Sequence, residues 1–212
     1  MRITYTVIVG MAFGVAIAPA AQSAGQQKPF PFSCATFPPG VSAADLSERF
    51  GKENVQTAPV PWGGAEGDYN EGTVLFSNDP NTRLEIYWTD TAGKRDPQWV
   101  SVRGDRSRWQ TPERVTLGTS LKSIEALNRR PFRLLGFATD ASGTVMSWSN
   151  GRLSTDSSEC RVRMRLRPAP EKTDRELSPL YRQLLGEREF SSGHPAMQAL
   201  DPSVYELFIQ YR

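Results

Sequence analysis

The chain has 212 residues, and its 25 lysine and arginine residues nearly balance its 23 aspartate and glutamate residues, giving a formal net charge of +2. This balance argues against a nucleic-acid-binding protein, which would carry a concentrated basic excess. The 16 prolines, 17 glycines and 10% aromatic residues are typical of a loop-rich domain that contains β-strands, rather than of a helical bundle.

The N-terminus has the pattern of an export signal. Arg2 supplies a positive charge, residues 7–18 form an apolar stretch, and the next six residues (PAAQSA) supply a helix breaker and the small residues of a cleavage site. A membrane anchor is the alternative, but about a dozen apolar residues are too short to span roughly 30 Å of hydrocarbon. We therefore expect residues 1–24 to be a signal peptide. Residues 25–212 should then act in the periplasm or be secreted, with no membrane span after cleavage.

The sequence has two cysteines, Cys34 and Cys160. In an oxidising compartment an even count predicts a disulfide, and closing a loop of about 125 residues removes roughly 4–5 kcal/mol of unfolded-state entropy. Two free thiols or a catalytic cysteine are the alternatives, and a Cys/His pair would have to use His194, the single histidine. Cys34 lies well beyond the predicted cleavage point, which argues against a lipid anchor.

A short helix is the first element predicted in the exported part, over residues 42–51. Ser42 is a candidate N-cap, Asp45 lies in the capping-box position, and Gly51 can end the helix. The local sequence therefore defines both ends of this helix.

A β region follows the helix. Residues 73–77 and 83–88 predict a hairpin around the turn at 78–81, and residues 98–103 predict a third strand. Within 83–88, alternate apolar residues share one face. Residues 104–114 are rich in arginine and predict an exposed loop.

A second helix and hairpin occupy the middle of the chain. Apolar residues at helical spacing over 121–127 predict the helix, Pro131 ends it, and strands are expected at 132–137 and 144–148. Asn150-Gly151 is the strongest hairpin dipeptide in the sequence. Both units share a Gly-x-Ser helix start and a T-D-x-[AS]-G turn, which suggests an internal repeat; chance similarity of two capped helices is the alternative.

Arginines alternate along the strand predicted to begin at Cys160. Side chains of one parity lie on one face about 7 Å apart, and such a row attracts phosphate, carboxylate or an acidic partner. These candidate binding residues are Arg161, Arg163, Arg165 and Arg167. The alternative is an outer sheet face whose arginines pair with Glu85 or with acidic residues on neighbouring strands. A helix from Ser178-Pro179 to Gly186 and a strand over 204–211 complete the predicted elements.

Tryptophans are the other candidate binding residues, because their rings can stack on sugars, although in a domain of this size they usually belong to the core. They are Trp62, Trp99, Trp109 and Trp148. Trp109, in the predicted exposed loop, joins the four arginines as a candidate binding residue.

The helix start G-x-[ST]-x-x-x-[LIV], followed by leucine, a proline and a hairpin, resembles small envelope modules of the SmpA/OmlA type. The layout is also similar to that of β-lactamase-inhibitor-protein-like domains, which implies a helical segment packed on an antiparallel sheet, and two such units would resemble the tandem modules of those inhibitors. The resemblance covers mainly residues 117–155 and weakly 39–90. Residues 127–131 (LNRRP) depart from the Leu-Gly-x-Pro corner of these modules. Residues 127–137 also resemble an uncharacterised family of exported bacterial proteins, which implies no activity.

Catalytic patterns are sparse. His194 lies in S-S-G-H-P without a local third residue to orient it, so a loop histidine is favoured. Asp90 and Asp140 could act as acid and base on a polysaccharide, but aspartates in turns usually bond their own backbone. A calcium site at 78–81 is weaker than the turn, because a proline obstructs it and no glutamate closes it. The sequence contains neither a G-x-S-x-G elbow nor a zinc motif.

We predict an α+β fold: an antiparallel sheet with short helices on one face, as one compact domain of residues 25–212 or as two modules (39–104 and 117–212). We expect a non-catalytic binding or accessory protein, an envelope factor or inhibitor-like module, that recognises a protein or an anionic envelope component without cofactor or metal. An envelope hydrolase acting on glycan or ester bonds through carboxylates is the alternative. Placement of Asp90, Asp140 and His194 in one pocket would favour the hydrolase, and their separation the binder.

Overall fold

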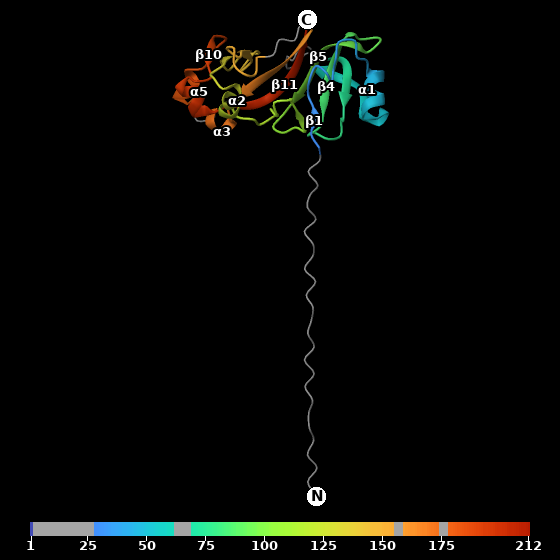
Figure 1. Cartoon of the computed structure of the whole chain (residues 1–212), viewed down its shortest axis with the longest axis horizontal. Helices are drawn as coiled ribbons and strands as arrows, with labels where there is room; N and C mark the ends of the chain where they lie inside the picture. The colour runs from blue at the N-terminus through green and yellow to red at the C-terminus, as the bar shows by residue number, and fades with distance from the viewer. Residues whose placement is uncertain (2–27, 62–68, 155–158, 174–177) are drawn as a thin grey trace.

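A computed structural model describes Met1 and residues 28–61, 69–154, 159–173 and 178–212. Residues 2–24 of the predicted signal peptide (1–24) and Trp62 lie outside these described residues. The described part contains β-strands in antiparallel sheets with short helices, which confirms the α+β prediction. Helices α2, α3 and α5 gather at one end of the molecule, α1 lies at the other, and β11 runs between them (Figure 1).

Short helices alternate with strands along the chain. The strands are β1 (Phe30–Pro31), β2 (Val55–Pro61), β3 (Tyr69–Leu75), β4 (Leu84–Asp90), β5 (Arg95–Arg103), β6 (Trp109–Gln110), β7 (Arg133–Leu135), β8 (Val145–Ser147), β9 (Cys160–Arg167), β10 (Glu189–Ser191) and β11 (Ser203–Tyr211). The helices are α1 (Ala43–Phe50), the 3₁₀ turn η1 (Lys52–Asn54), α2 (Leu121–Asn128), α3 (Pro170–Thr173), α4 (Pro179–Arg182) and α5 (Pro195–Leu200).

The main sheet has six strands in the order β2-β3-β4-β5-β11-β9. The last strand, β11, lies between β5 and β9 and is antiparallel to both. Strands β10, β7 and β8 form a separate three-stranded sheet, and β1 pairs with β6 in parallel. Because β9 and β11 complete a sheet begun by β2–β5, both predicted modules contribute to one sheet.

The capping box at the start of α1 is present as predicted. The Ser42 hydroxyl accepts a hydrogen bond from the backbone N–H of Asp45 at 3.2 Å, and the Asp45 carboxylate accepts one from the backbone N–H of Ser42 at 2.8 Å. Gly51 follows the helix with a φ of 91°, in the region that favours glycine. Local sequence therefore explains this helix without reference to the rest of the fold.

Strand β2, which contains Pro59 and Pro61, was not among the elements predicted from the sequence. It lies at one edge of the main sheet, paired with β3. Proline is tolerated in an edge strand, where a missing N–H removes no interior hydrogen bond. The prolines therefore mark an edge rather than the absence of a strand.

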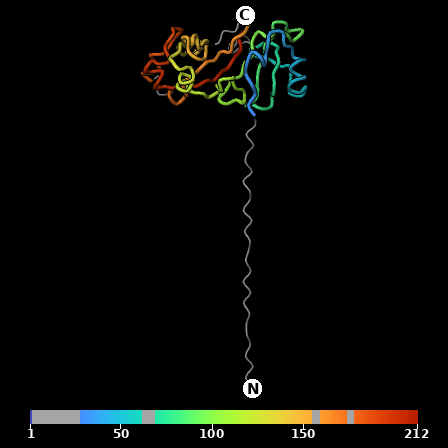
Figure 2. Tube along the Cα trace, viewed as in Figure 1, coloured from blue at the N-terminus to red at the C-terminus, as the bar shows by residue number. Residues whose placement is uncertain are grey.

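The core side of the main sheet packs on the N-terminal segment and the loop before α2. Phe30, Phe37 and Phe50 gather around the indole of Trp109, with ring centroids 4.9, 5.6 and 5.8 Å away. Trp109 is fully buried, and its Nε1 donates to the backbone oxygen of Thr82 at 2.7 Å. Figure 2 shows the blue start of the described chain beside the green segments of the sheet. The prediction of an exposed loop at Trp109 is therefore wrong: the segment contributes β6 and an aromatic anchor of the core.

A disulfide joins Cys34, in the N-terminal segment, to Cys160 at the start of β9, as predicted. The two Cα atoms lie 6.2 Å apart. Cys160 is buried and Cys34 is partly buried, so this covalent link packs against the core.

The Asn150-Gly151 turn does not close the hairpin that its sequence favours. β8 ends at Ser147, and β9, the next strand, pairs with β11 instead. The turn holds Asn128, whose Nδ2 donates to the backbone oxygen of Trp148 at 3.0 Å and whose side chain fills the space beside Gly151. A helix-end contact thus replaces the predicted strand pairing.

Candidate functional site: an arginine-lined hollow

Strand β9 shows the alternation that its sequence predicts. Met164 and Leu166 are buried on the core side, whereas Arg161 and Arg167 are exposed on the outer face of the main sheet. The four arginines differ in their neighbours, so they do not form a uniform row.

Arg163 is half-buried within the outer face. Its Nη1 lies 3.5 Å from Oε1 of Gln210, and its Nη2 lies 3.9 Å from the sulfur of Met146. Burial, together with repulsion from Arg161 and Arg165, lowers the pKa of the Arg163 guanidinium below its ordinary value. Its two Nη atoms therefore contact Gln210 on β11 and Met146 on β8, whereas its Nε has no hydrogen-bond partner among the described residues.

A buried carboxylate holds two arginines at the centre of the outer face. Nε of Arg103 donates to Oε1 of Glu206 at 2.9 Å, and Nη1 of Arg165 lies 3.3 Å from Oε2 of Glu206. Glu206 is only 1% exposed. Burial raises the pKa of Glu206, and the attraction of the two arginines opposes that rise. The strand order explains the contact, because β11 presents Glu206 opposite both Arg103 on β5 and Arg165 on β9.

Arg165 therefore pairs with an acidic residue on a neighbouring strand, as the alternative interpretation predicted, but through Glu206. Glu85 pairs instead with Arg83, at 2.8 Å. Within the described residues, Nη2 of Arg103 and Nε of Arg165 have no hydrogen-bond partner. Glu206 therefore does not use the full donor capacity of the two guanidinium groups.

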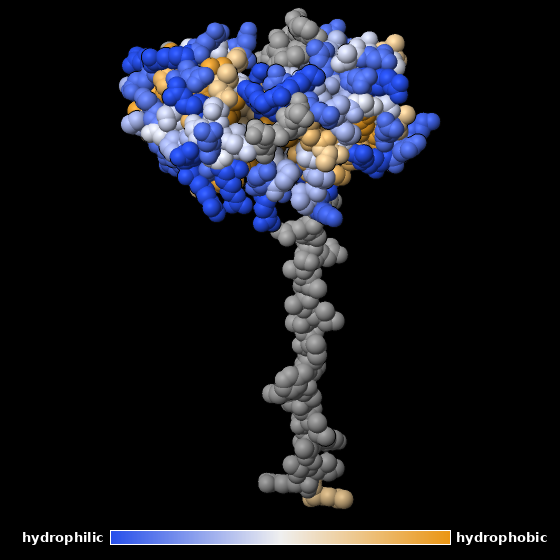
Figure 3. Space-filling view, turned by 45° about the horizontal axis from the view of Figure 1, so that its top comes forward, coloured by the Kyte–Doolittle hydropathy of each residue, from blue (hydrophilic) through white to orange (hydrophobic). Residues whose placement is uncertain are grey.

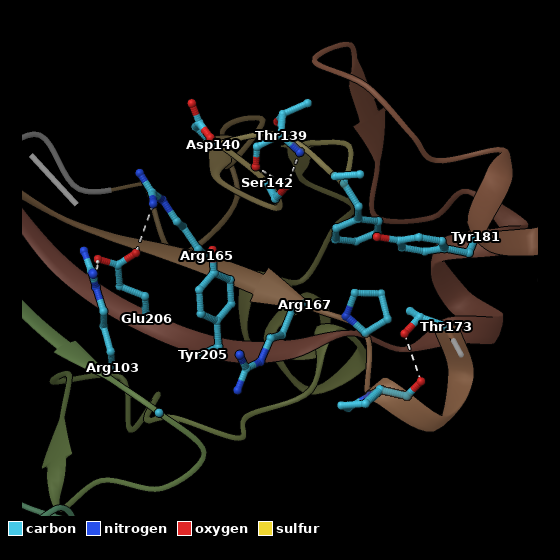
Figure 4. A pocket seen from close by; sticks show the side chains of 15 residues that line it. Arg103, Thr139, Asp140, Ser142, Arg165, Arg167, Thr173, Tyr181, Tyr205 and Glu206 are labelled. Atoms are coloured by element: carbon cyan, nitrogen blue, oxygen red, sulfur yellow. Dashed lines mark hydrogen bonds and ion pairs between the residues drawn. The ribbon is translucent and has the colours of Figure 1, made fainter. Parts of the chain in front are cut away.

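Arg103, Arg165 and Glu206 form the floor of a hollow of about 730 Å³, which we call the arginine hollow (Figure 4). Its size falls within the range of roughly 300–1,000 Å³ typical of small-molecule sites. Three arginines and two acidic residues line it: Arg103, Arg165, Arg167, Asp140 and Glu206. The lining therefore carries more positive than negative charge.

Tyr205 stands in the middle of the arginine hollow (Figure 4). The register between β11 and β9 shifts between Val204 and Glu206, and such a bulge re-aims a side chain. The Cζ atom of Arg167 lies 5.1 Å from the centroid of the Tyr205 ring, and Nη2 of Arg167 lies 2.8 Å from Oδ1 of Asp105. The Arg167 side chain is 49% exposed, so it is the most accessible of the three lining arginines.

The opposite wall consists of the loop after β7 and of α4. The rings of Phe137 and Tyr181 stack with centroids 5.8 Å apart, and burial raises the pKa of the Tyr181 phenol. In the loop, the backbone N–H of Thr139 donates to the hydroxyl of Ser142 at 2.8 Å. The wall thus offers one aromatic face and several hydroxyl groups.

The candidate catalytic residues lie in different places. Asp90 accepts a hydrogen bond from the backbone N–H of Gly93 at 2.9 Å in the β4–β5 turn, whereas Asp140 lies in the arginine hollow. His194 caps α5, and its Nδ1 accepts from the backbone N–H of Ala196 at 3.2 Å. Neither Asp90 nor His194 lines the arginine hollow with Asp140.

The serine beside His194 is also committed to structure. The hydroxyl of Ser192 is fully buried, accepts from the backbone N–H of Phe132 at 2.9 Å and donates to the carboxylate of Glu125. Ser192 therefore ties β7 to α2 and is not presented to a substrate. The turn at 78–81 is likewise self-contained, because Asp79 accepts from the backbone N–H of Asn81 at 2.9 Å, which lowers the pKa of its carboxyl.

The described tryptophans of the prediction pack against protein. Trp99 stacks on Phe208 with ring centroids 4.2 Å apart, and Trp148 packs on Phe132 at 5.3 Å. With Trp109 in the core, the aromatic groups that face the arginine hollow are tyrosines and Phe137, which sequence reasoning did not select. The sequence did offer one indication of this site: Glu206 is the acidic residue in the otherwise mostly apolar strand β11.

The face shown in Figure 3 is mostly hydrophilic, with apolar residues in small patches. Within the described ranges, no helix is long and apolar enough to cross a membrane, and no group of three or more histidine, cysteine or acidic side chains is placed to hold a metal ion. No family model, no curated protein and no solved structure matches the chain.

Proposed function

We propose that this chain is a non-catalytic binding protein, acting in the periplasm or after secretion, whose arginine hollow binds an anionic group of its partner. The observation that carries the proposal is the convergence of Arg103, Arg165 and Arg167 on one hollow with a surplus of positive charge. Guanidinium groups bind carboxylate and phosphate through paired hydrogen bonds.

The architecture supports a fixed site rather than a fluctuating charged surface. Arg103 and Arg165 extend from β5 and β9, the two neighbours of β11, and are oriented by Glu206, so their guanidinium groups are preorganised. Arg167 is oriented by Asp105 and by the Tyr205 ring. Preorganised donors bind an anion with a smaller entropic cost.

The separation of Asp90, Asp140 and His194 favours binding over the alternative, an envelope hydrolase. The second acidic residue of the arginine hollow, Glu206, is almost fully buried between two arginines and is therefore poorly placed to exchange protons with a substrate. The Cys34–Cys160 disulfide supports a location outside the cytoplasm, where such bonds persist.

The proposal is tested by NMR titration of protein expressed from the full sequence, with glucuronate and inorganic phosphate as anionic probes and glucose as the neutral control. We expect an anion to shift the backbone amide signals of Gly104, Thr139 and Ser142, which line the arginine hollow, and glucose to leave them unchanged. Arg167→Gln should remove the shifts. That side chain is half-exposed and its ion pair is with a 90% exposed Asp105, so the variant should fold.

Arg161→Gln is the matched control. It removes the same charge from the same face of β9 but lies outside the arginine hollow. Equal shifts with glucose, or equal loss of binding in both variants, would contradict a specific anion site.

A further inference from the structure

A second hollow adjoins the arginine hollow on the outer face of the main sheet. It measures about 450 Å³ and is lined by the ends of β2 and β3 and by β4 and β5. Arg103 lines both hollows. We call the second one the tyrosine hollow, after Tyr69, which is 62% exposed.

The tyrosine hollow repeats the chemistry of the first. It contains an arginine held by a carboxylate, with Nη2 of Arg83 2.8 Å from Oε1 of Glu85, and an aromatic ring at its rim. The arginine hollow contains the pair of Arg103 and Glu206 with Tyr205. Two similar sites joined by a shared residue suit a ligand that is itself repetitive.

We propose that the anionic ligand is an acidic glycan chain, which lies across both hollows and passes over Arg103. This inference rests on the proposed function and specifies its ligand. Arginines would bind the carboxylates of successive acidic sugars, the tyrosine rings would pack on sugar faces, and the partly exposed carboxylate of Glu85 would accept hydrogen bonds from sugar hydroxyls.

An extended peptide fits this surface less well. Strands β4, β5 and β11 each have a hydrogen-bonded neighbour on both sides. Of the two edge strands, β2 contains Pro59 and Pro61, and β9 already bonds to residues 143–144, so neither offers a regular free edge for an added peptide strand. The hydroxyls of Thr139 and Ser142 and the phenol rings in the lining instead suit a polyhydroxylated ligand.

The test is a calorimetric titration with galacturonate oligomers, using the dimer and the octamer. Because a longer chain engages both hollows at once, we expect the octamer to bind on the order of a hundredfold more tightly than the dimer. Arg83→Gln and Tyr69→Ser should weaken the octamer and leave the dimer unchanged, whereas Arg167→Gln should weaken both. Arg161→Gln should change neither.

Two further probes decide the ligand class: a fully methyl-esterified octamer, which has the same chain without charge, and octaglutamate. Both should bind at least about tenfold more weakly than the acidic octamer. Equal affinity of dimer and octamer, equal affinity of octaglutamate, or no binding of the octamer would overturn the glycan inference. The proposed function would still stand if glucuronate or phosphate shifts the amides of the arginine hollow, and both proposals fall if none of these anions binds.

Discussion

Removal of the disulfide is the change whose effect on stability follows most directly from the structure. Cys34 and Cys160 are 126 positions apart, and in the chain-entropy model a cross-link of that span restricts the unfolded state by about 4.9 kcal/mol at 25 °C. Domains of this kind have a free energy of unfolding of about 5–15 kcal/mol. Cys34→Ala with Cys160→Ala should therefore remove a large share of the stability. Alanine is used because Cys160 is buried, and serine would place a hydroxyl in the core.

Urea unfolding of the oxidised wild type, the reduced wild type and the double variant measures the effect. With a slope of about 2 kcal/mol per molar urea, the midpoint should fall by about 2.5 M. Each single variant should match the double variant, because either change breaks the bond. The reduced wild type should match them within about 1 kcal/mol, since it keeps both side chains. Midpoints of the oxidised wild type and double variant that agree within about 0.3 M would refute the reasoning.

Four other variants test individual contacts. Trp109→Ala should lower the free energy of unfolding by about 3–5 kcal/mol in urea titration, since it empties the centre of the aromatic core; a loss below about 1 kcal/mol would place the indole outside the core. Ser42→Ala should cost about 1 kcal/mol in the same assay by removing the cap of α1, and a Thr replacement should restore most of it. Burial raises the pKa of Glu206, so the folded state holds its proton more tightly than the unfolded state does. The contribution of Glu206 to the free energy of unfolding is therefore most favourable below its unfolded pKa and is lost as pH rises. From about pH 4 to about pH 7, the free energy of unfolding of the wild type should thus fall relative to that of Glu206→Gln. The opposite trend would show that the arginines outweigh burial. Burial raises the pKa of Tyr211 above its ordinary 10.0, so the wild type should lose stability as pH rises beyond about 10, and Tyr211→Phe should lose less between about pH 9 and about pH 11.

Elements with local signals were predictable from the sequence. The Ser42–Asp45 capping box and the alternation of β9 depend on residues a few positions apart, and both are present in the structure. The arrangement of the arginine hollow depends on strand order. Arg103 and Glu206 meet because β11 inserts beside β5, a pairing across 103 positions that no local pattern indicates.

Trp109 shows the same limit in another way. Its neighbours along the chain are polar and basic, so a local window predicts an exposed loop. The aromatic residues that bury it come from the N-terminal segment, α1 and the end of β3, far from it in sequence. Its environment is set by tertiary packing, which outweighs local composition.

The position of β11 has a consequence for the order of folding. Strand β11 follows both β5 and β9 in the sequence and lies between them in the sheet, so β5 and β9 stay separated until residues 203–211 are in place. Such long-range pairing slows folding and delays burial of the core. The same strand that orients the arginines therefore also determines when the main sheet can be completed.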